Sequence, residues 1–317
     1  MELRLSYICY VLIRNSRGYY CGIRCIIRSK KFGEKTAVNN ISFKIEKPGV
    51  FGLLGTNGAG KTTTIRMILG ILEKDSGLIK WNGIPVTRET VKFGYLPEER
   101  GLYPKAKIVD QLSYFGKLRG MDRVSVKKVI AYWFDRLKVS EYWNSTAEQL
   151  SKGNQQKIQF ITALLHDPEL IILDEPLSGL DPVNADLFKE IIYELVEKGK
   201  FIIMSSHQMQ SIEDYCEDLI ILKDGETVLQ GNLNQIKAGY GRTNLTINCE
   251  EDIDALIVDQ GVRLISKTAK GYEIKIKSDA QAYSLLDKII SSKIRLHKFE
   301  IREPSLHEIF IEKVGEQ

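Results

Sequence analysis

The sequence predicts an α/β protein with a mostly parallel main sheet, an inserted helical lobe and a small α+β domain near the C-terminal end. Short apolar runs alternate with helix-like segments, strand patterns are absent from Val109 to Leu165, and strand-like alternation resumes near Leu245. Strands bounded by helices favour a parallel sheet covered on both faces. The expected strands are Ser42–Ile45, Val50–Leu54, Leu170–Leu173, Phe201–Met204 and Leu219–Leu222.

Composition limits the classes of function. The chain has 317 residues, of which 43% are hydrophobic and 27% charged, as in ordinary globular proteins. The net charge is +4, but residues 1–28 hold five Arg and one Glu, so residues 29–317 are balanced and give no electrostatic reason to expect nucleic acid. The five scattered cysteines indicate free thiols in a reducing cytosol. They are Cys9, Cys21, Cys25, Cys216 and Cys249.

The first 22 residues lie outside every pattern, because the first strand-like segment is near Ile23–Ile27. We expect them to be an unstructured N-terminal extension. The alternative is a basic and apolar leader that touches anionic lipid. The apolar stretch Leu5–Ile13 is shorter than the roughly 18 to 20 residues that a membrane-spanning helix needs. We therefore expect no membrane span.

A glycine-rich loop lies between the apolar run Val50–Leu54 and a helical pattern that begins at Lys61. Glycines let successive backbone N–H groups point into one concavity, and the helix N-terminus and Lys61 add positive charge. A threonine hydroxyl after the lysine is placed to ligate Mg²⁺. The spacing GxxxxGKT therefore predicts a P-loop that holds a nucleoside triphosphate. Its residues are Gly55, Thr56, Asn57, Gly58, Ala59, Gly60, Lys61, Thr62 and Thr63.

The apolar strand Leu170–Leu173 ends in two carboxylates, Asp174 and Glu175. Acidic groups at the C-terminal edge of a strand beside a phosphate loop are where Mg²⁺ is held. We expect Asp174 to hold the metal through water. Glu175 would polarise the attacking water as a general base.

The remaining helices have recognisable starts. Pro182 follows Asp181, the spacing of Val183, Leu187, Ile191 and Leu195 predicts a helix packed on the sheet, and Gly199 ends it. In the C-terminal domain, Ser278 with Gln281 and Ser305 with Glu308 have capping-box spacing. We expect this domain to cover residues 241–317, after the turn-rich residues 239–241, and to have a packing or regulatory role.

Three further segments identify the kind of P-loop protein. They are Leu150-Ser151-Lys152-Gly153-Asn154-Gln155-Gln156 before Asp174, Ser178-Gly179-Leu180-Asp181 directly after it, and His207 after the strand Phe201–Met204. In this order the motifs resemble the ATP-binding cassette of ABC transporters, which carries an LSGGQ signature, an SGLD-type D-loop and a switch histidine. The resemblance covers about residues 23–240, with the helical lobe at about 99–165. The tail is similar to the accessory domain of sodium- and antibiotic-exporter ATPase subunits.

The resemblance implies roles for these residues. In the family two cassettes face head to tail, so Ser151 and Gly153 of one copy, with Asp181 of the D-loop nearby, would close over the ATP γ-phosphate held by the other. His207 would hydrogen-bond that phosphate. Phe32 corresponds to the aromatic residue that stacks on adenine, where the alternative is a core phenylalanine.

The sequence departs from the family pattern at four positions. Glu98 stands where a glutamine usually contacts the metal, and we expect it to remain a ligand with Thr62 and Asp174. Lys152 replaces the first signature glycine and is expected to face solvent or to assist at the phosphate of the other copy. Asn154 replaces the signature glutamine, and Thr56 replaces a common proline with little expected effect.

The resemblance also implies partners. The expected function is ATP hydrolysis that powers export, with ATP and Mg²⁺ bound, a second copy or a homologous ATPase, and a separate integral-membrane permease. Residues 98–103 and the neighbouring helices of the helical lobe would form the dock, with Arg100, Leu102 and Tyr103 exposed. The protein would lie in the cytoplasm against the inner face of the membrane. The alternatives are an importer subunit, or a soluble ABC-type ATPase that acts on the ribosome or DNA; relatives of the latter kind carry paired cassettes or long coiled coils.

Overall fold

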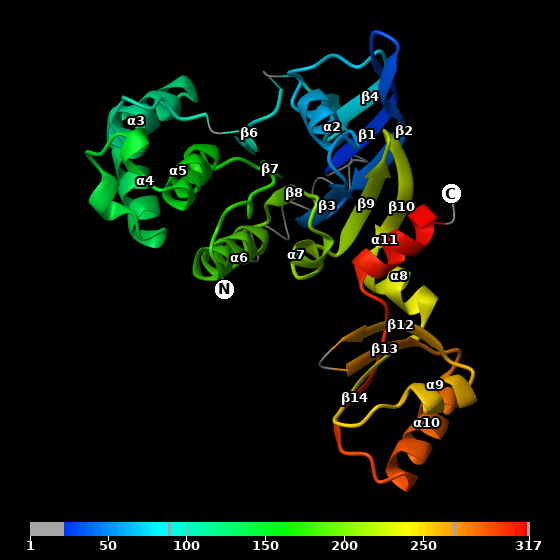
Figure 1. Ribbon diagram of the computed structural model, residues 1–317. Helices are drawn as coiled ribbons and strands as arrows, with labels where there is room; N and C mark the ends of the chain where they lie inside the picture. Colours follow the sequence, from blue (N-terminus) through cyan, green and yellow to red (C-terminus); the bar gives the residue numbers. More distant parts are fainter. Residues whose placement is uncertain (1–21, 88–89, 100, 269–270, 316–317) are drawn as a thin grey trace. The chain divides into compact units, whose positions relative to one another are not determined.

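A computed structural model describes residues 22–87, 90–99, 101–268 and 271–315 (Figure 1). The chain divides into two compact units, Met1–Gln230 and Gly231–Gln317. The expected boundary was at residues 240/241, so the observed division lies earlier. The prediction for residues 1–22 falls outside the described residues, except for Gly22.

The first unit contains a six-stranded sheet in the order β10-β9-β3-β8-β7-β6. Neighbouring strands from β9 to β6 pair in parallel. Their apolar cores match four expected strands, and the buried residues of β7 and β8 explain why those runs are continuously apolar. The strands are β3 (Gly49–Gly55), β6 (Phe93–Leu96), β7 (Leu170–Asp174), β8 (Phe201–Ser206), β9 (Asp218–Lys223) and β10 (Glu226–Asn232).

A second, antiparallel sheet has the order β2-β1-β4-β5. Its strands are β1 (Ile23–Phe32), β2 (Lys35–Ile45), β4 (Ser76–Trp81) and β5 (Ile84–Pro85). The placement of Ser42–Ile45 in the parallel sheet was wrong, because this segment is the end of β2. A tight turn at Gly33 joins β1 to β2, and such a turn can connect antiparallel strands only. The two sheets share one hydrophobic core, which includes Ile41, Leu53 and Ile203.

The helices of this unit are α2 (Lys61–Ile68), α3 (Ile108–Leu118), α4 (Arg123–Arg136), α5 (Lys152–Leu164), α6 (Pro182–Glu197) and α7 (Met209–Glu213). In Figure 1, α3, α4 and α5 form a lobe apart from α2 and the antiparallel sheet. Leu187, Ile191 and Leu195 of α6 are buried as expected. Val183 is 75% exposed, so its assignment to the buried face was wrong. It lies in the first turn, beyond the part of α6 that is buried.

The second unit holds a four-stranded antiparallel sheet in the order β12-β13-β11-β14 and its own core around Ile247, Ile274 and Leu285. Its strands are β11 (Asn244–Cys249), β12 (Arg263–Thr268), β13 (Gly271–Lys275) and β14 (Leu296–Arg302). Its helices are α8 (Leu233–Tyr240), α9 (Asp254–Asp259), α10 (Asp279–Ser291) and α11 (Leu306–Gly315). The turn-rich residues 239–241 thus lie at the end of α8, a helix that begins with the side-chain cap Asn232.

Candidate active site

The glycine-rich loop joins β3 to α2 and has the expected strand-loop-helix context. Gly60 precedes α2 with φ of 98°, a conformation that side chains rarely adopt. A Cβ at this position would lie 2.7 Å from the carbonyl oxygen of Ala37. Both constraints require glycine, so that the loop can pack closely against β2 where α2 begins.

Lys61, Glu175 and His207 meet at the C-terminal edge of the parallel sheet. Lys61 Nζ donates to the carbonyl oxygens of Gly55 and Thr56 at 2.8 and 3.2 Å and lies 3.6 Å from Glu175 Oε1. His207 Nδ1 lies 2.8 Å from the same carboxylate oxygen. Glu175 is 5% exposed, and its backbone has φ of 52°, an uncommon conformation for a residue other than glycine. The predicted catalytic residues therefore form one contact group.

Asp174 is fully buried one residue earlier. Burial raises the pKa of its carboxyl, while the hydrogen bond from Ser205 and the nearby Thr62 hydroxyl act in the opposite direction. Ser205 Oγ donates to Asp174 Oδ1 at 2.5 Å, and Asp174 Oδ2 is a buried oxygen without a hydrogen-bond partner among the described residues. A buried carboxylate with one free oxygen beside a threonine hydroxyl is suited to a hard divalent cation.

A cavity of about 440 Å³ lies over the glycine-rich loop. Phe32 stands at its rim, 51% exposed, so the core-phenylalanine alternative was wrong. Glu98 lines the same cavity, and its charge is one of the causes that raise the Asp174 pKa. Ala59 points instead into the core, 2% exposed. The predicted residues around the cavity are Phe32, Asn57, Gly58, Gly60, Lys61, Thr62, Thr63 and Glu98.

Three predicted residues belong to a different place in the unit. Ser151 caps α5 by accepting from the Asn154 N–H at 3.3 Å, and Asp181 caps α6 by accepting from the Asn184 N–H at 3.0 Å. A Cβ on Gly153 would lie 3.7 Å from Leu180, so the signature segment and the D-loop are neighbours. Each cap satisfies one backbone N–H of its own helix, and the positive ends of both helix dipoles lie at this surface. Lys152 is exposed there.

Sequence reasoning missed Lys35 and Ala37, which line the cavity from β2. Lys35 pairs with Phe32 across the β1–β2 hairpin. The turn residues around Gly33 indicated this hairpin, and the hairpin would have placed Lys35 beside the phosphate loop as a second cation. Ser205 was also missed, because its position at the end of an apolar strand does not reveal which strand lies beside it in the sheet.

An apolar groove of about 790 Å³ lies between β6 and the helices α3 and α5. Its lining includes Phe93, Tyr95, Phe115, Leu118 and Ala163. Leu102 lines it as well and is half-buried, and the neighbouring Tyr103 is 58% exposed. Arg100 lies outside the described residues. The groove is thus a second feature of the unit, distinct from the cavity at the glycine-rich loop.

Comparison with known proteins decides the family. The profile described as "ABC transporter" matches residues 38–178. The uncharacterised ABC transporter ATP-binding protein YhaQ of Bacillus subtilis (strain 168) is 48% identical over 288 residues, which cover 90% of this chain and 96% of YhaQ. The chain belongs to the ATP-binding subunits of ABC transporters.

Further similarities cover the rest of this ABC transporter subunit. Residues 231–314 match the profile "ATP-binding protein DrrA1-3-like, C-terminal domain". The linearmycin resistance ATP-binding protein LnrL of the same Bacillus strain is 32% identical, over 90% of this chain and 96% of LnrL. A solved ATP-binding subunit of an ABC transporter aligns with a TM-score of 0.64 and 28% identity, over 69% of this chain and 93% of that one.

Membership of the family has direct consequences. ABC transporter ATP-binding subunits bind ATP and hydrolyse it to power transport, and in general they dimerise and work with membrane permeases. In the described part of this chain, no helix combines the length and apolarity that crossing a membrane requires.

Proposed function

We propose that this subunit powers export through a separate permease and hydrolyses ATP between two copies of the chain. The observation that carries the proposal is the contact group of Lys61, Glu175 and His207. A lysine, a buried carboxylate and an imidazole beside a phosphate cradle supply charge stabilisation, a proton acceptor and a positioning group for phosphoryl transfer to water.

In the proposed mechanism, Glu175 orients a water for attack on the γ-phosphorus and accepts its proton. His207 Nδ1 contacts that carboxylate and holds its orientation, and with ATP bound the imidazole would exchange this contact for a hydrogen bond to the γ-phosphate. Lys61 exchanges its loop carbonyl partners for phosphate oxygens, where its charge stabilises the transferring group. Phe32 stacks on the adenine, and Lys35 adds a second cation near the phosphates.

The donor set also fits Mg²⁺. Thr62, Glu98 and Asp174 would hold it, and the partner-free Asp174 Oδ2 supports this assignment. The bound cation would neutralise phosphate charge in the reaction. Among the chain's own groups, Ser205 keeps the Asp174 carboxylate oriented.

A second copy completes the proposed site. Ser151, Gly153 and Asp181 lie at the starts of α5 and α6 and do not line the phosphate-loop cavity, which supports a role toward the nucleotide of the other copy. The exposed Lys152 would then lie near that phosphate.

We place the permease's contact in the groove between β6, α3 and α5, which would hold the subunit at the cytoplasmic face of the membrane. An apolar concavity with Tyr103 exposed beside it suits an amphipathic helix. Export is favoured over import because relatives include a linearmycin resistance protein and Nod factor export proteins.

Replacing both Leu102 and Tyr103 by Asp tests the dock. We expect transport to be lost in permease-containing vesicles, while the basal ATPase rate of the isolated subunit stays unchanged. Transport at the parental rate would show that the dock lies elsewhere.

Glu175→Gln tests the mechanism. Removing the proton acceptor should lower the ATPase rate about 10² to 10⁴-fold and leave ATP binding intact, so ATP and Mg²⁺ should drive dimer formation seen by light scattering. Glu197→Gln, an exposed change at the end of α6, is the matched control. Undiminished turnover would remove Glu175 from the mechanism, and a variant that stays monomeric with ATP would contradict the shared site.

A further inference from the structure

The turn between α3 and α4 carries a basic and apolar surface, named here the hairpin surface. Its cations are Lys117, Arg123, Lys127 and Lys128, all exposed. Two large aliphatic side chains lie among them, Leu118 at 64% exposure and Val124 at 63%. Single exposed aliphatic side chains are common on protein surfaces, so the feature that matters here is the position of these two within a cluster of cations.

The charge of the hairpin surface is not balanced locally. Asp122 is the one acidic residue between Lys117 and Lys128. Its carboxylate caps α4, accepting from the N–H groups of Val124 and Ser125. The ion pairs of α4 among the described residues start from Arg136 at its far end. Since residues 29–317 sum to zero charge, this surface is a local positive excess on a balanced body.

Helix geometry places these residues together. Arg123 with Lys127, and Val124 with Lys128, are four residues apart and are therefore neighbours on the surface of α4. Lys117 and Leu118 are in the last turn of α3, which packs beside α4 (Figure 1). Cations and aliphatic groups are thus interleaved within about two helical turns.

We infer that the hairpin surface contacts the anionic lipid surface of a membrane. Apolar side chains inserted at the headgroup level with lysine and arginine around them are the chemistry of interfacial membrane binding. A nucleic acid would use the cations but would leave Leu118 and Val124 uncovered. The surface also adjoins the groove, because Leu118 and Arg119 line that groove.

The inference goes beyond the proposed function and rests on it at one point: a permease seated in the groove would bring the hairpin surface close to the bilayer. The lipid contact itself needs neither ATP nor permease, so it is measurable on the subunit alone. Failure of the lipid contact and failure of the ATPase mechanism are therefore distinguishable.

The test is sedimentation of the full-length subunit with vesicles of phosphatidylcholine alone or mixed with phosphatidylglycerol. We expect binding to the mixed vesicles that weakens with salt. Each lysine near an anionic surface contributes about a 5-fold gain in affinity, so Lys117→Gln with Lys127→Gln and Lys128→Gln should weaken binding on the order of 100-fold. Adding Val124→Ser to this triple variant should weaken vesicle binding further with no change in net charge.

The matched control carries Lys44→Gln, Lys47→Gln and Lys198→Gln, three exposed positions outside the hairpin with the same change in net charge. It should bind like the parent protein, and both triple variants should keep the parental ATPase rate. Equal weakening in both triple variants would show a non-specific charge effect and overturn the proposal. So would binding that survives the hairpin changes and disappears on deletion of residues 2–22, or binding to an acidic permease peptide with none to vesicles.

Discussion

Ser205 contacts both acidic residues of the site, Asp174 through its carboxylate and Glu175 through its backbone N–H. Its hydroxyl donates to Asp174 Oδ1 and accepts from the Glu175 N–H at 3.1 Å. Ser205→Ala removes both bonds inside a buried site, so the free energy of unfolding should fall by about 2 kcal/mol, and more Mg²⁺ should be needed for half-maximal ATPase rate.

The stability loss of Ser205→Ala should depend on pH in a defined direction. A folded-state pKa raised by burial means that the Asp174 carboxylate costs stability when charged, and losing the Ser205 bond raises the pKa further. The difference in unfolding free energy between the parent and Ser205→Ala should therefore become smaller as pH falls through the Asp174 pKa. Urea unfolding at several pH values measures this loss, with Ser42→Ala, at an exposed position of β2, as the control. A deficit that does not change with pH would contradict the role of Ser205.

Local context was predictable where a motif fixes spacing. The structure confirms the strand-loop-helix context of the phosphate loop, the strand end at Asp174 and the helix cap at Ser151, while the roles of these residues stay predictions. Ser205 and Lys35 act from neighbouring strands. Sequence spacing within one strand carries no information about such partners, because strand order is set by the packing of the whole sheet.

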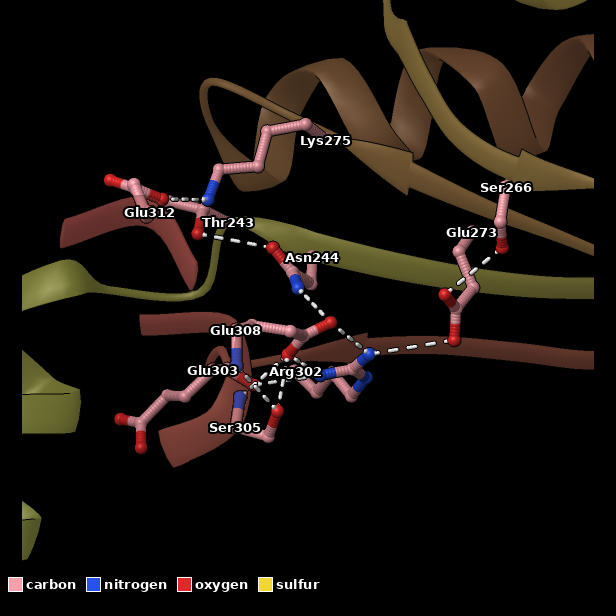
Figure 2. A network of polar contacts seen from close by, with 10 residues as sticks. All are labelled: Thr243, Asn244, Ser266, Glu273, Lys275, Arg302, Glu303, Ser305, Glu308 and Glu312. Atoms are coloured by element: carbon pink, nitrogen blue, oxygen red, sulfur yellow. Dashed lines mark hydrogen bonds and ion pairs between the residues drawn. The ribbon is translucent and has the colours of Figure 1, made fainter. Parts of the chain in front are cut away.

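At the scale of elements, α11 is fixed to the sheet of the second unit by a polar network around Arg302 and Glu308 (Figure 2). Glu308 forms the expected capping box, accepting from the Ser305 N–H at 2.6 Å while its own N–H donates to Ser305 Oγ at 3.3 Å. Arg302 donates to both Glu308 oxygens at 2.7 and 2.9 Å, and Asn244 of β11 donates to one of them. One carboxylate therefore joins α11, β14 and β11.

Glu308→Gln should loosen this junction. Burial alone would raise the pKa of Glu308, but hydrogen bonds from Arg302 and Ser305 outweigh it and lower the pKa to about 2. A depressed pKa gives stability that is present above the unfolded value of about 4.3 and lost as pH falls toward 2. Allowing for screening at a partly exposed pair, we expect a loss of about 1 to 2 kcal/mol at pH 7 that shrinks below pH 4.

Hydrogen exchange of α11 peptides in the full chain measures the effect. The control is Glu312→Gln, on the same helix but in a more exposed pair with Lys275, which should cost under about 0.5 kcal/mol. Equal losses in the two variants, or a loss that persists at low pH, would contradict the assignment to Glu308.

The elements themselves were predictable to different degrees. Strong apolar runs gave the parallel strands, whereas Ser42–Ile45 was misplaced because one run cannot reveal its partner. The start at Ser278 also differs from the expected capping box: the Gln281 side chain accepts from the Lys277 N–H rather than from that of Ser278. Serine-to-glutamine spacing indicates a helix start but does not fix the exact bond.

At the scale of the whole molecule, each unit has its own core, and the cavity proposed to bind nucleotide is lined by residues of the first unit. A ligand stabilises the unit that binds it by about 2.7 kcal/mol at a hundredfold excess over its dissociation constant. Nucleotide should thus suppress opening of the first unit and leave the second unit's local opening unchanged.

Cysteines report on the two units separately. Cys25 and Cys216 are buried in the first unit, with burial raising the pKa of both thiols, while Cys249 in the second unit is half-buried. In Glu175→Gln protein, which keeps its nucleotide, ATP and Mg²⁺ should slow alkylation of Cys25 and Cys216 about 100-fold, because labelling needs opening of their unit. Labelling of Cys249 should keep its rate. Mass spectrometry of the labelled peptides separates the sites, and equal protection of Cys249 would mean that the two units open together.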